Sequence, residues 1–314
     1  MHLFLRLFGS LLLWGCMAII LILVILLPRE TESHRVGVKD VMSYHFTWDG
    51  YKQNIYDYVE VVKTKKSLGT TVFNQPVETE LLLYFKRSIA ILLPALLLSI
   101  MIGIYKGVFD YRFQHNKIGR LFGRVSTWLG QAVPDFFLIF LFQTLLSLAI
   151  SHSLLPRVDL YGNDKWYSIF LPILFLSMYP AFIIAKYTFQ ALEEEDEKDY
   201  IKTAKAKGVP DRVVLWRHIL KNCYPKLLQH FMPIILILFS GMFVVEFLTL
   251  YHGIGYRLIA AIHIKNKFMA GEAFPIDVPA IIGFSLLIMV LLLFAQWIHQ
   301  LLEFFLNPKR GERL

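Results

Sequence analysis

Six long runs of apolar residues constrain the fold of this 314-residue chain more than any other feature. They occupy residues 11–27, 88–105, 125–150, 167–184, 231–251 and 280–297. Each run is close to or above the roughly 18 apolar residues that a helix needs to cross the core of a bilayer. Strands of a membrane barrel need only about ten residues. The sequence therefore predicts an all-α membrane protein with six transmembrane helices.

Composition and charge agree with this class. Hydrophobic residues make up 56% of the chain and charged residues 18%, whereas soluble domains carry about 25% charged residues. Five Lys or Arg lie in 106–124, nine in 186–226 and three in 306–314, but only two in 151–166 and three in 252–275. The positive-inside rule places the first three segments and both termini in the cytosol. The net charge of +8 is thereby explained without a nucleic-acid partner.

The first run is interpreted as a retained helix and not as a cleaved signal peptide. Arg6 is the only Lys or Arg before it, and Pro, Arg and Glu follow at 28–30, where a cleavage site would need small residues. We therefore predict an N-terminal transmembrane helix (1–27), an extracytoplasmic loop (28–87) and a core of five membrane helices (88–314). The loop has apolar residues at helical spacing, which predicts a short amphipathic helix lying against the membrane or the bundle: Tyr51, Ile55, Tyr58, Val59 and Val62.

Metal and disulfide sites are not predicted. Cys16 lies in the first run and Cys223 in a cytosolic segment, so the two cannot pair, and their spacing fits no metal or redox motif. His252 and His263 are both placed outside, without a third residue at ligand spacing.

The polar segment 199–222, between the fourth and fifth runs, reads DYIKTAKAKGVPDRVVLWRHILKN. Gly208 suits the left-handed end of one helix, and Pro210 and Asp211 suit the first turn of the next. On that second helix three apolar residues are expected on one face: Val213, Trp216 and Leu220. The acidic run before it, 193–197, is interpreted as a solvated helix face. Small residues, a glycine and basic residues in this order predict a helix, a break and a second helix that form a docking surface for a soluble partner.

This segment resembles a motif of the inner-membrane permease subunits of ABC importers. The chain is most similar to the first permease of the oligopeptide, dipeptide and nickel group, whose loop reads roughly D-Y-x-x-T-A-x-A-K-G and then R-H-x-L-x-N. The matching residues are Asp199, Tyr200, Thr203, Ala204, Ala206, Lys207, Gly208, Arg217, His218, Leu220 and Asn222.

The resemblance continues along nearly the whole chain. Three further motifs of the family have similar stretches here. They are residues 68–70 with 76–77, residues 245–246 followed by 253–255, and Leu306-Asn307-Pro308-Lys309. The resemblance implies a fold like that of a type I ABC importer. Residues 88–314 would form the permease core, and 191–228 would form the coupling loop between spans 4 and 5. The loop helix would enter a groove of a cytosolic ATPase and pass ATP-driven motion to the spans.

The resemblance also implies partners. These are a second permease subunit, two cytosolic ATP-binding subunits and an extracytoplasmic substrate-binding lipoprotein, all at a bacterial cytoplasmic membrane and its lipid. ATP and Mg²⁺ would bind the partner subunits, because this chain contains no Gly-Lys dipeptide and so no P-loop. The expected cargo is an oligopeptide or dipeptide. No catalytic residue and no bound cofactor are assigned to this chain.

Two acidic residues lie inside predicted spans. Asp135 follows Pro134, about ten helical residues or roughly 15 Å from the cytosolic end, where a carboxylate usually faces a cavity or a partner. We assign it to the translocation pathway, where it would attract a cationic group such as a peptide amino terminus. A contact with the partner permease and a protonated carboxyl are the open alternatives. Glu246, near the outer end of the fifth run, is assigned to the outer gate or to a contact with the binding protein; an interfacial carboxylate that reaches water is its alternative.

Other classes of function are less consistent with the sequence. An integral membrane enzyme would carry a motif such as H-E-x-x-H or G-x-S-x-G, and none occurs. A stand-alone channel or secondary carrier would not need the ordered inner loop. Import of nickel, a metallophore or another small solute by the same mechanism stays open, because the motifs concern the motor and not the cargo.

Overall fold

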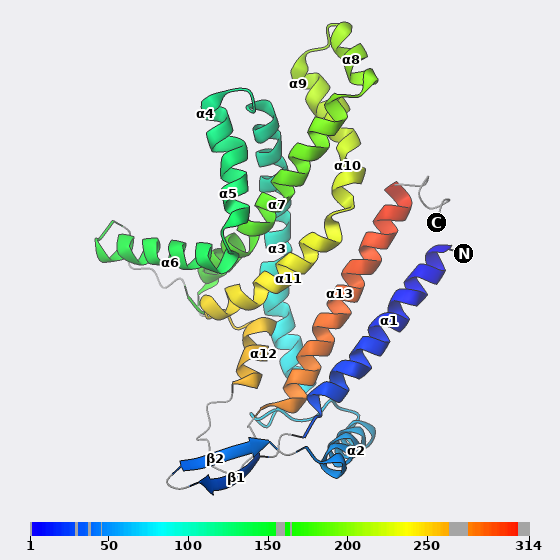
Figure 1. Ribbon diagram of the computed structural model, residues 1–314, viewed down its shortest axis with the longest axis vertical. Coiled ribbons are helices and arrows are strands. Elements are labelled where there is room, and N and C mark those ends of the chain that lie inside the picture. The colour runs from blue at the N-terminus through cyan, green and yellow to red at the C-terminus, as the bar shows by residue number, and fades with distance from the viewer. Residues whose placement is uncertain are drawn as a thin grey trace. The chain divides into compact units, whose positions relative to one another are not determined.

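The computed structural model describes residues 2–28, 31–36, 39–44, 46–154, 161–163, 165–263 and 276–306 (Figure 1). For His2, residues 31–36 and 39–44, and Asp135, only the backbone is described. Three positions of the closing motif, 307–309, lie outside the described residues. The described chain is built mainly from helices, as the apolar runs predict.

Among the described residues, five helices are long and apolar enough to cross a membrane. They are α1 (His2–Ile25), α3 (Val77–Arg112), α7 (Phe170–Asp196) with the short η2 (Trp166–Ile169) before it, α11 (Phe231–Leu248) and α13 (Val278–Leu306). These helices correspond to five of the six predicted spans. Pro94 lies inside α3 and Pro180 inside α7 without ending either helix, as membrane helices tolerate.

The third predicted span, 125–150, is broken. It contains α5 (Ser126–Ala132) and α6 (Asp135–Ser151), and the axis bends by 106° between them. Pro134 causes the break, since it disfavours the helical region for Val133, which adopts φ −86° and ψ 127°. Two short elements, α4 (Lys117–Arg120) and η1 (Leu121–Val125), precede α5. The described residues contain six candidate spans if these elements, α5 and α6 are counted as one bent span. The third run is therefore not one continuous helix, and the depth calculated for Asp135 along a continuous helix is wrong.

The loop after α1 is only partly helical. Strands β1 (Thr31–Val36) and β2 (Lys39–Tyr44) pair antiparallel, with Thr31 opposite Tyr44, so the expectation of an all-α chain needs correction. The amphipathic helix predicted next is confirmed as α2 (Trp48–Lys65). Lys66 ends it in the left-handed conformation, with φ 49°.

The chain forms two compact units. The first comprises Met1–Leu3, Ile89–Tyr251 and Phe294–Leu314, and the second Phe4–Ser88 and His252–Leu293. In the first unit α3 packs closely on α7 at Gly103 and Gly107: a Cβ on Gly107 would lie 2.6 Å from the carbonyl oxygen of Ala185. Two glycines four apart allow membrane helices to approach closely. Close packing of α3 on α7 is therefore part of the core of the first unit.

A buried polar cluster joins α3 to α5 in the same unit. Lys106 forms an ion pair with Asp110, which is 2% exposed. The Lys106 ammonium also donates to Thr127 Oγ1 at 2.8 Å and to the carbonyl of Gly123 at 2.9 Å. A charge in a membrane helix needs such partners, and the i,i+4 spacing of this pair was visible in the sequence.

The second unit contains a buried ion cluster around Arg257 of α12 (Ile254–Ile262). Arg257 Nε donates to Glu80 Oε2 and Nη2 donates to Asp277 Oδ2, both at 2.7 Å. Thr71 donates to the other oxygen of Glu80 at 2.6 Å. Because these residues are all 5% exposed or less, the cluster fastens the first turn of α3 and the start of α13 to α12.

Candidate coupling surface and membrane cavity

The segment 199–222 forms the predicted helix, break and second helix. Its first helix, α8 (Asp199–Ala206), ends in a Schellman turn at Gly208, where φ is +77°. The Gly208 N–H donates to the carbonyl of Lys205 at 3.0 Å and the Val209 N–H to that of Ala204 at 3.2 Å. A Cβ on Gly208 would meet no atom within 4 Å. Glycine is therefore favoured here by backbone conformation and not by lack of space.

The second helix begins at α9 (Asp211–Val213), continues as the π-helix η3 (Val214–Ile219) and ends as α10 (Leu220–Leu228). Pro210 precedes it as the N-cap. The predicted apolar face is wrong in part, since Val213 is 39% exposed and Trp216 49%. The side chains buried instead are Val214, Leu215, Ile219 and Leu220. A π-helix bonds i to i+5, which brings 214 beside 219 and 215 beside 220.

An apolar cluster holds this segment against the ends of two membrane helices. Ile201 of α8 and Val214 of η3 are buried with Val108 of α3 and Leu192 of α7. Cys223 belongs to the same cluster, and burial raises the pKa of its thiol to about 11. The loop is thus packed onto α3 and α7, so a force on α8 or η3 acts directly on those helices.

Polar contacts fasten the same junction. Tyr200 donates to Glu195 at 2.6 Å, and Asn222 donates to the Tyr200 hydroxyl at 2.8 Å. Lys226 lies 2.9 Å from Glu194 and 3.3 Å from Glu195. Burial and the bond to Glu195 raise the pKa of Tyr200, so the phenol stays the donor. The interpretation of 193–197 as a solvated face is wrong only for Glu195, which is buried and paired, whereas Glu193, Glu194 and Glu197 are exposed.

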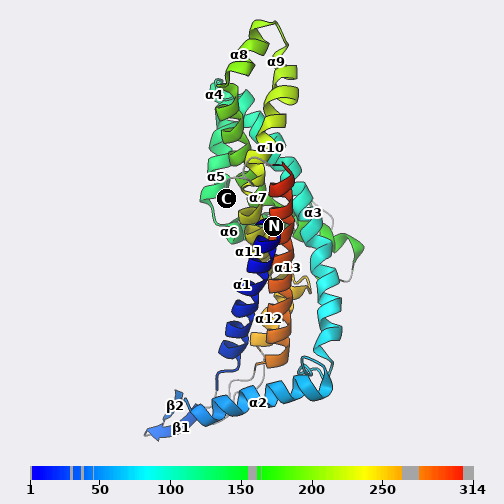
Figure 2. The same cartoon turned by 90° about the vertical axis from the view of Figure 1, so that its right-hand side faces the viewer.

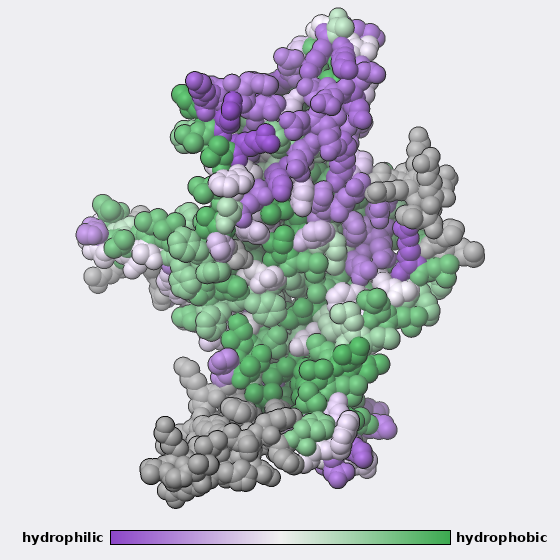
Figure 3. Space-filling model, in the orientation of Figure 1, coloured by the Kyte–Doolittle hydropathy of each residue, from purple (hydrophilic) through white to green (hydrophobic). Residues whose placement is uncertain are grey.

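The outer surface of the loop carries most of the residues singled out in the sequence. Hydrophilic side chains cover α8 to α10, whereas hydrophobic ones cover most of α6 (Figure 3). Ala204 and His218 are half-buried, and the other predicted coupling residues are exposed: Asp199, Tyr200, Thr203, Ala206, Lys207, Gly208 and Arg217. Exposed Trp216 adds an aromatic side chain to this surface that the sequence had assigned to the packed face.

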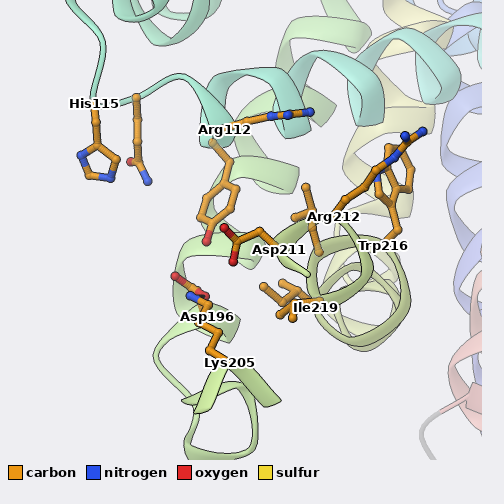
Figure 4. A pocket seen from close by; sticks show the side chains of 12 residues that line it. Arg112, His115, Asp196, Lys205, Asp211, Arg212, Trp216 and Ile219 are labelled. Carbon is orange, nitrogen blue, oxygen red and sulfur yellow. Dashed lines mark hydrogen bonds and ion pairs between the residues drawn. The ribbon is translucent and has the colours of Figure 1, made fainter. Parts of the chain in front are cut away.

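A cavity of about 330 Å³ opens beside the loop (Figure 4). Residues from the end of α3, the end of α7, α8 and α9 surround it, with both signs of charge: Arg112, His115, Asp196, Lys205, Asp211 and Arg212. Lys205 pairs with Asp196 across 2.7 Å. The coupling surface is therefore concave and polar as well as aromatic.

A second cavity, of about 510 Å³, lies at the α5–α6 break. Val133 and Pro134 line it together with Tyr179 of α7 and Ser240 of α11. In the part of the chain that the structure describes, neither of these two hydroxyls has a hydrogen-bond partner. A hydroxyl at membrane depth is stabilised by water or by a ligand. This cavity therefore offers two hydroxyls among mainly apolar lining residues.

The two intramembrane acids occupy different places. Asp135 is the first residue of α6 and directly follows the lining residue Pro134. Glu246 is fully buried on α11, two residues before the helix ends at Leu248. Among the described residues, no His, Cys, Asp and Glu side chains group in threes as a metal site would require.

Comparison with known proteins identifies the family. Residues 95–307 match the profile described as "Binding-protein-dependent transport system inner membrane component". The chain belongs to this family. The match contains the loop, both cavities and both intramembrane acids. The protein is thus a permease of the bacterial plasma membrane with several spans, which confirms the predicted resemblance and location.

Relatives of this permease carry names that refer to peptides. A dipeptide transport system permease protein of Lactococcus lactis is 27% identical over 220 residues, 70% of this chain and 68% of the relative. An oligopeptide transport system permease protein of Bacillus subtilis is 26% identical over 277 residues, 82% of each chain. A glutathione transport system permease protein of Pectobacterium atrosepticum is 26% identical over 200 residues, 63% of each chain.

Proposed function

We propose that this permease is one of two membrane subunits of an ATP-driven importer of peptides and that its segment 199–222 docks on a cytosolic ATPase. The observation that carries the proposal is the packing of this loop. Its exposed face has small, basic and aromatic residues, while its buried face is fixed to α3 and α7 through Ile201 and Val214. Closure of an ATPase dimer would therefore move α8 and η3 together with the membrane helices.

The remaining parts follow the same scheme. Both termini and the loop 191–228 are placed in the cytosol by the positive-inside rule. A second permease completes the pathway, two ATP-binding subunits hold ATP and Mg²⁺, and an external binding lipoprotein delivers the cargo. Glu246, buried near the outer end of α11, is assigned to the outer gate.

Peptide cargo is supported by the names of the relatives and by the membrane cavity. The hydroxyls of Tyr179 and Ser240 can bond peptide N–H and carbonyl groups whatever the side chains are. Asp135, beside the lining residue Pro134, is assigned to attract the amino terminus of the peptide.

The docking surface is tested with Trp216→Ala and Arg217→Ala in the intact transporter, with uptake of a labelled dipeptide and co-purification of the ATP-binding subunit as the measurements. Trp and Arg often dominate interfaces, so a loss of about tenfold or more is expected in both. Tyr224→Ala is the matched control: this residue is 50% exposed on α10 but lies outside 199–222. Full uptake by both loop variants, or the absence of an associated ATP-binding subunit, would refute the proposal.

A further inference from the structure

Helix α2 crosses the C-terminal end of α1 (Figure 2). An apolar crevice lies between the two helices, within the second compact unit. Its volume is about 300 Å³. The residues that matter for its chemistry come from both helices and are Ile19, Ile22, Ile55, Val59, Val62 and Lys63. All but one of these have aliphatic side chains, so the walls of the crevice are apolar and Lys63 provides a cation.

The two walls are held in place by hydrogen bonds. The Tyr51 hydroxyl donates to the carbonyl of Leu23 at 3.0 Å, and the Asn54 amide donates to that of Leu26 at 3.2 Å. Leu23 lies in the last turn of α1 and Leu26 directly follows the end of the helix, so neither carbonyl has a partner inside the helix. The angle between α1 and α2 is thereby fixed, and the crevice is a built feature of this corner.

One face of α2 lines the crevice. Ile55, Tyr58, Val59, Val62 and Lys63 follow the i, i+3, i+4, i+7, i+8 pattern of a single helical stripe. Val59 is 39% and Val62 36% exposed, although both lie on the side of α2 that faces α1. The two helices therefore leave part of their facing apolar surface uncovered.

The surroundings indicate what covers it. In the most apolar stretch of α1 only 6% of the residues are buried inside the protein, and an apolar helix surface that the protein leaves uncovered is suited to contact with lipid. Water is a poor occupant, because a bound water needs two to four polar partners and the walls provide almost none. Lys63 pairs with no carboxylate among the described residues, and a cation at this position complements a phosphate.

We propose that this crevice is a specific site for an anionic glycerophospholipid, with one acyl chain between α1 and α2 and its phosphate at Lys63. The lipid would complete the apolar contact that α2 makes with α1 and so hold the extracytoplasmic helix at the membrane surface. The site differs from general lipid contact in having walls from two helices and a charged end.

The test uses the intact transporter in vesicles with a phosphatidylglycerol that carries a photoreactive group near the end of its acyl chain. Cross-linked peptides are mapped by mass spectrometry. The expected result is labelling concentrated in residues 19–26 and 55–62. Val59→Trp fills the crevice and should lower this labelling about fivefold or more, since a pocket of this size cannot hold both groups. Tyr56→Trp is the matched control, because Tyr56 is 64% exposed and does not line the crevice. This variant should leave the labelling unchanged.

Two further variants separate the parts of the site. Ile22→Trp fills the crevice from the side of α1. If Val59→Trp fails to fold, the labelling of this variant tests whether the lipid occupies the crevice. Lys63→Gln should raise the phosphatidylglycerol concentration for half-maximal labelling about threefold or more, whereas Lys65→Gln, which lies off this crevice, should not. Unchanged labelling in both tryptophan variants, labelling spread evenly along α1, or capture of only the acyl chain of the binding lipoprotein would each overturn the proposal. No effect of Lys63→Gln would overturn the assignment of the phosphate.

Discussion

Arg257 shows how much one side chain decides in this permease. It is 2% exposed and forms ion pairs with two buried carboxylates, Glu80 and Asp277. The remaining oxygens accept from Thr71 and from backbone N–H groups. Buried ions are tolerated when every partner is present, and removal of one partner leaves an uncompensated charge. The cluster therefore makes the corner of α12, α3 and α13 depend on a single guanidinium.

Arg257→Met is expected to destabilise the protein by about 3–5 kcal/mol, because Glu80 and Asp277 would remain buried without a counter-ion. Thermal unfolding of the purified permease in detergent measures this loss. Arg212→Met is the control, since Arg212 is exposed at the side of the loop cavity, and its effect should stay within about 0.5 kcal/mol. Equal melting temperatures for the two variants would mean that the ion cluster does not hold the fold.

At the scale of elements, proline has different consequences at different places. Pro94 and Pro180 lie within continuous helices, whereas Pro134 separates α5 from α6. The rule that proline disfavours a helical residue before it is the same in each case. What differs is the packing: Gly130 of α5 lies so close to Phe182 that a Cβ there would come within 2.5 Å of the ring. The break at Val133 supplies one wall of the membrane cavity.

Pro134→Ala should allow α5 and α6 to join into one straighter helix. Spin labels at residues 128 and 142, both exposed, report the change as an inter-label distance. Fourteen residues of continuous helix span roughly 21 Å, so the variant should approach this backbone separation while the unsubstituted protein, bent by 106°, stays shorter. Pro94→Ala with the same labels is the control. No lengthening in Pro134→Ala would place the cause of the bend in the tertiary packing alone.

At the scale of the whole molecule, some helices have residues in both compact units. α3 and α13 each have one end in either unit, and α3 also contacts the loop 199–222 through Val108. If the loop docks on an ATPase as proposed, its motion must reach the cargo. The cavity at the α5–α6 break is lined in part by α7 and α11. It belongs to the first unit, and so does the candidate coupling surface.

Asp135→Asn tests whether the acid next to this cavity selects the cargo. Uptake of a peptide with a free, cationic amino terminus should fall about tenfold, because loss of an ion pair in a poorly hydrated site costs of the order of 1–3 kcal/mol. Uptake of the same peptide with an acetylated amino terminus should change little. The ratio of the two rates, measured in vesicles with the complete transporter, is the readout. An unchanged ratio would remove Asp135 from the pathway.

Local patterns could be read from the sequence because they act over a few residues. Apolar length predicted the membrane helices, the glycine at 208 predicted the break in the loop, and helical spacing predicted α2. The motif residues identified the family. The π-helix was missed because its i+5 pairing changes which side chains are buried, and nothing in 214–219 distinguishes it from an α-helix.

Tertiary structure alone decided the features that join distant segments. Arg257 donates a hydrogen bond to Glu80, which is 177 positions away in the sequence. Asn54 donates to the carbonyl of Leu26, which is 28 positions away. A charged residue at 80 or 257 looks like any residue of a loop until the chain brings the two together. The sequence thus determined which segments enter the membrane and which family the chain belongs to. The ion cluster, the cavity at Pro134 and the crevice beside α2 depend on topology, because burial and pairing are properties of contacts and not of neighbours along the chain.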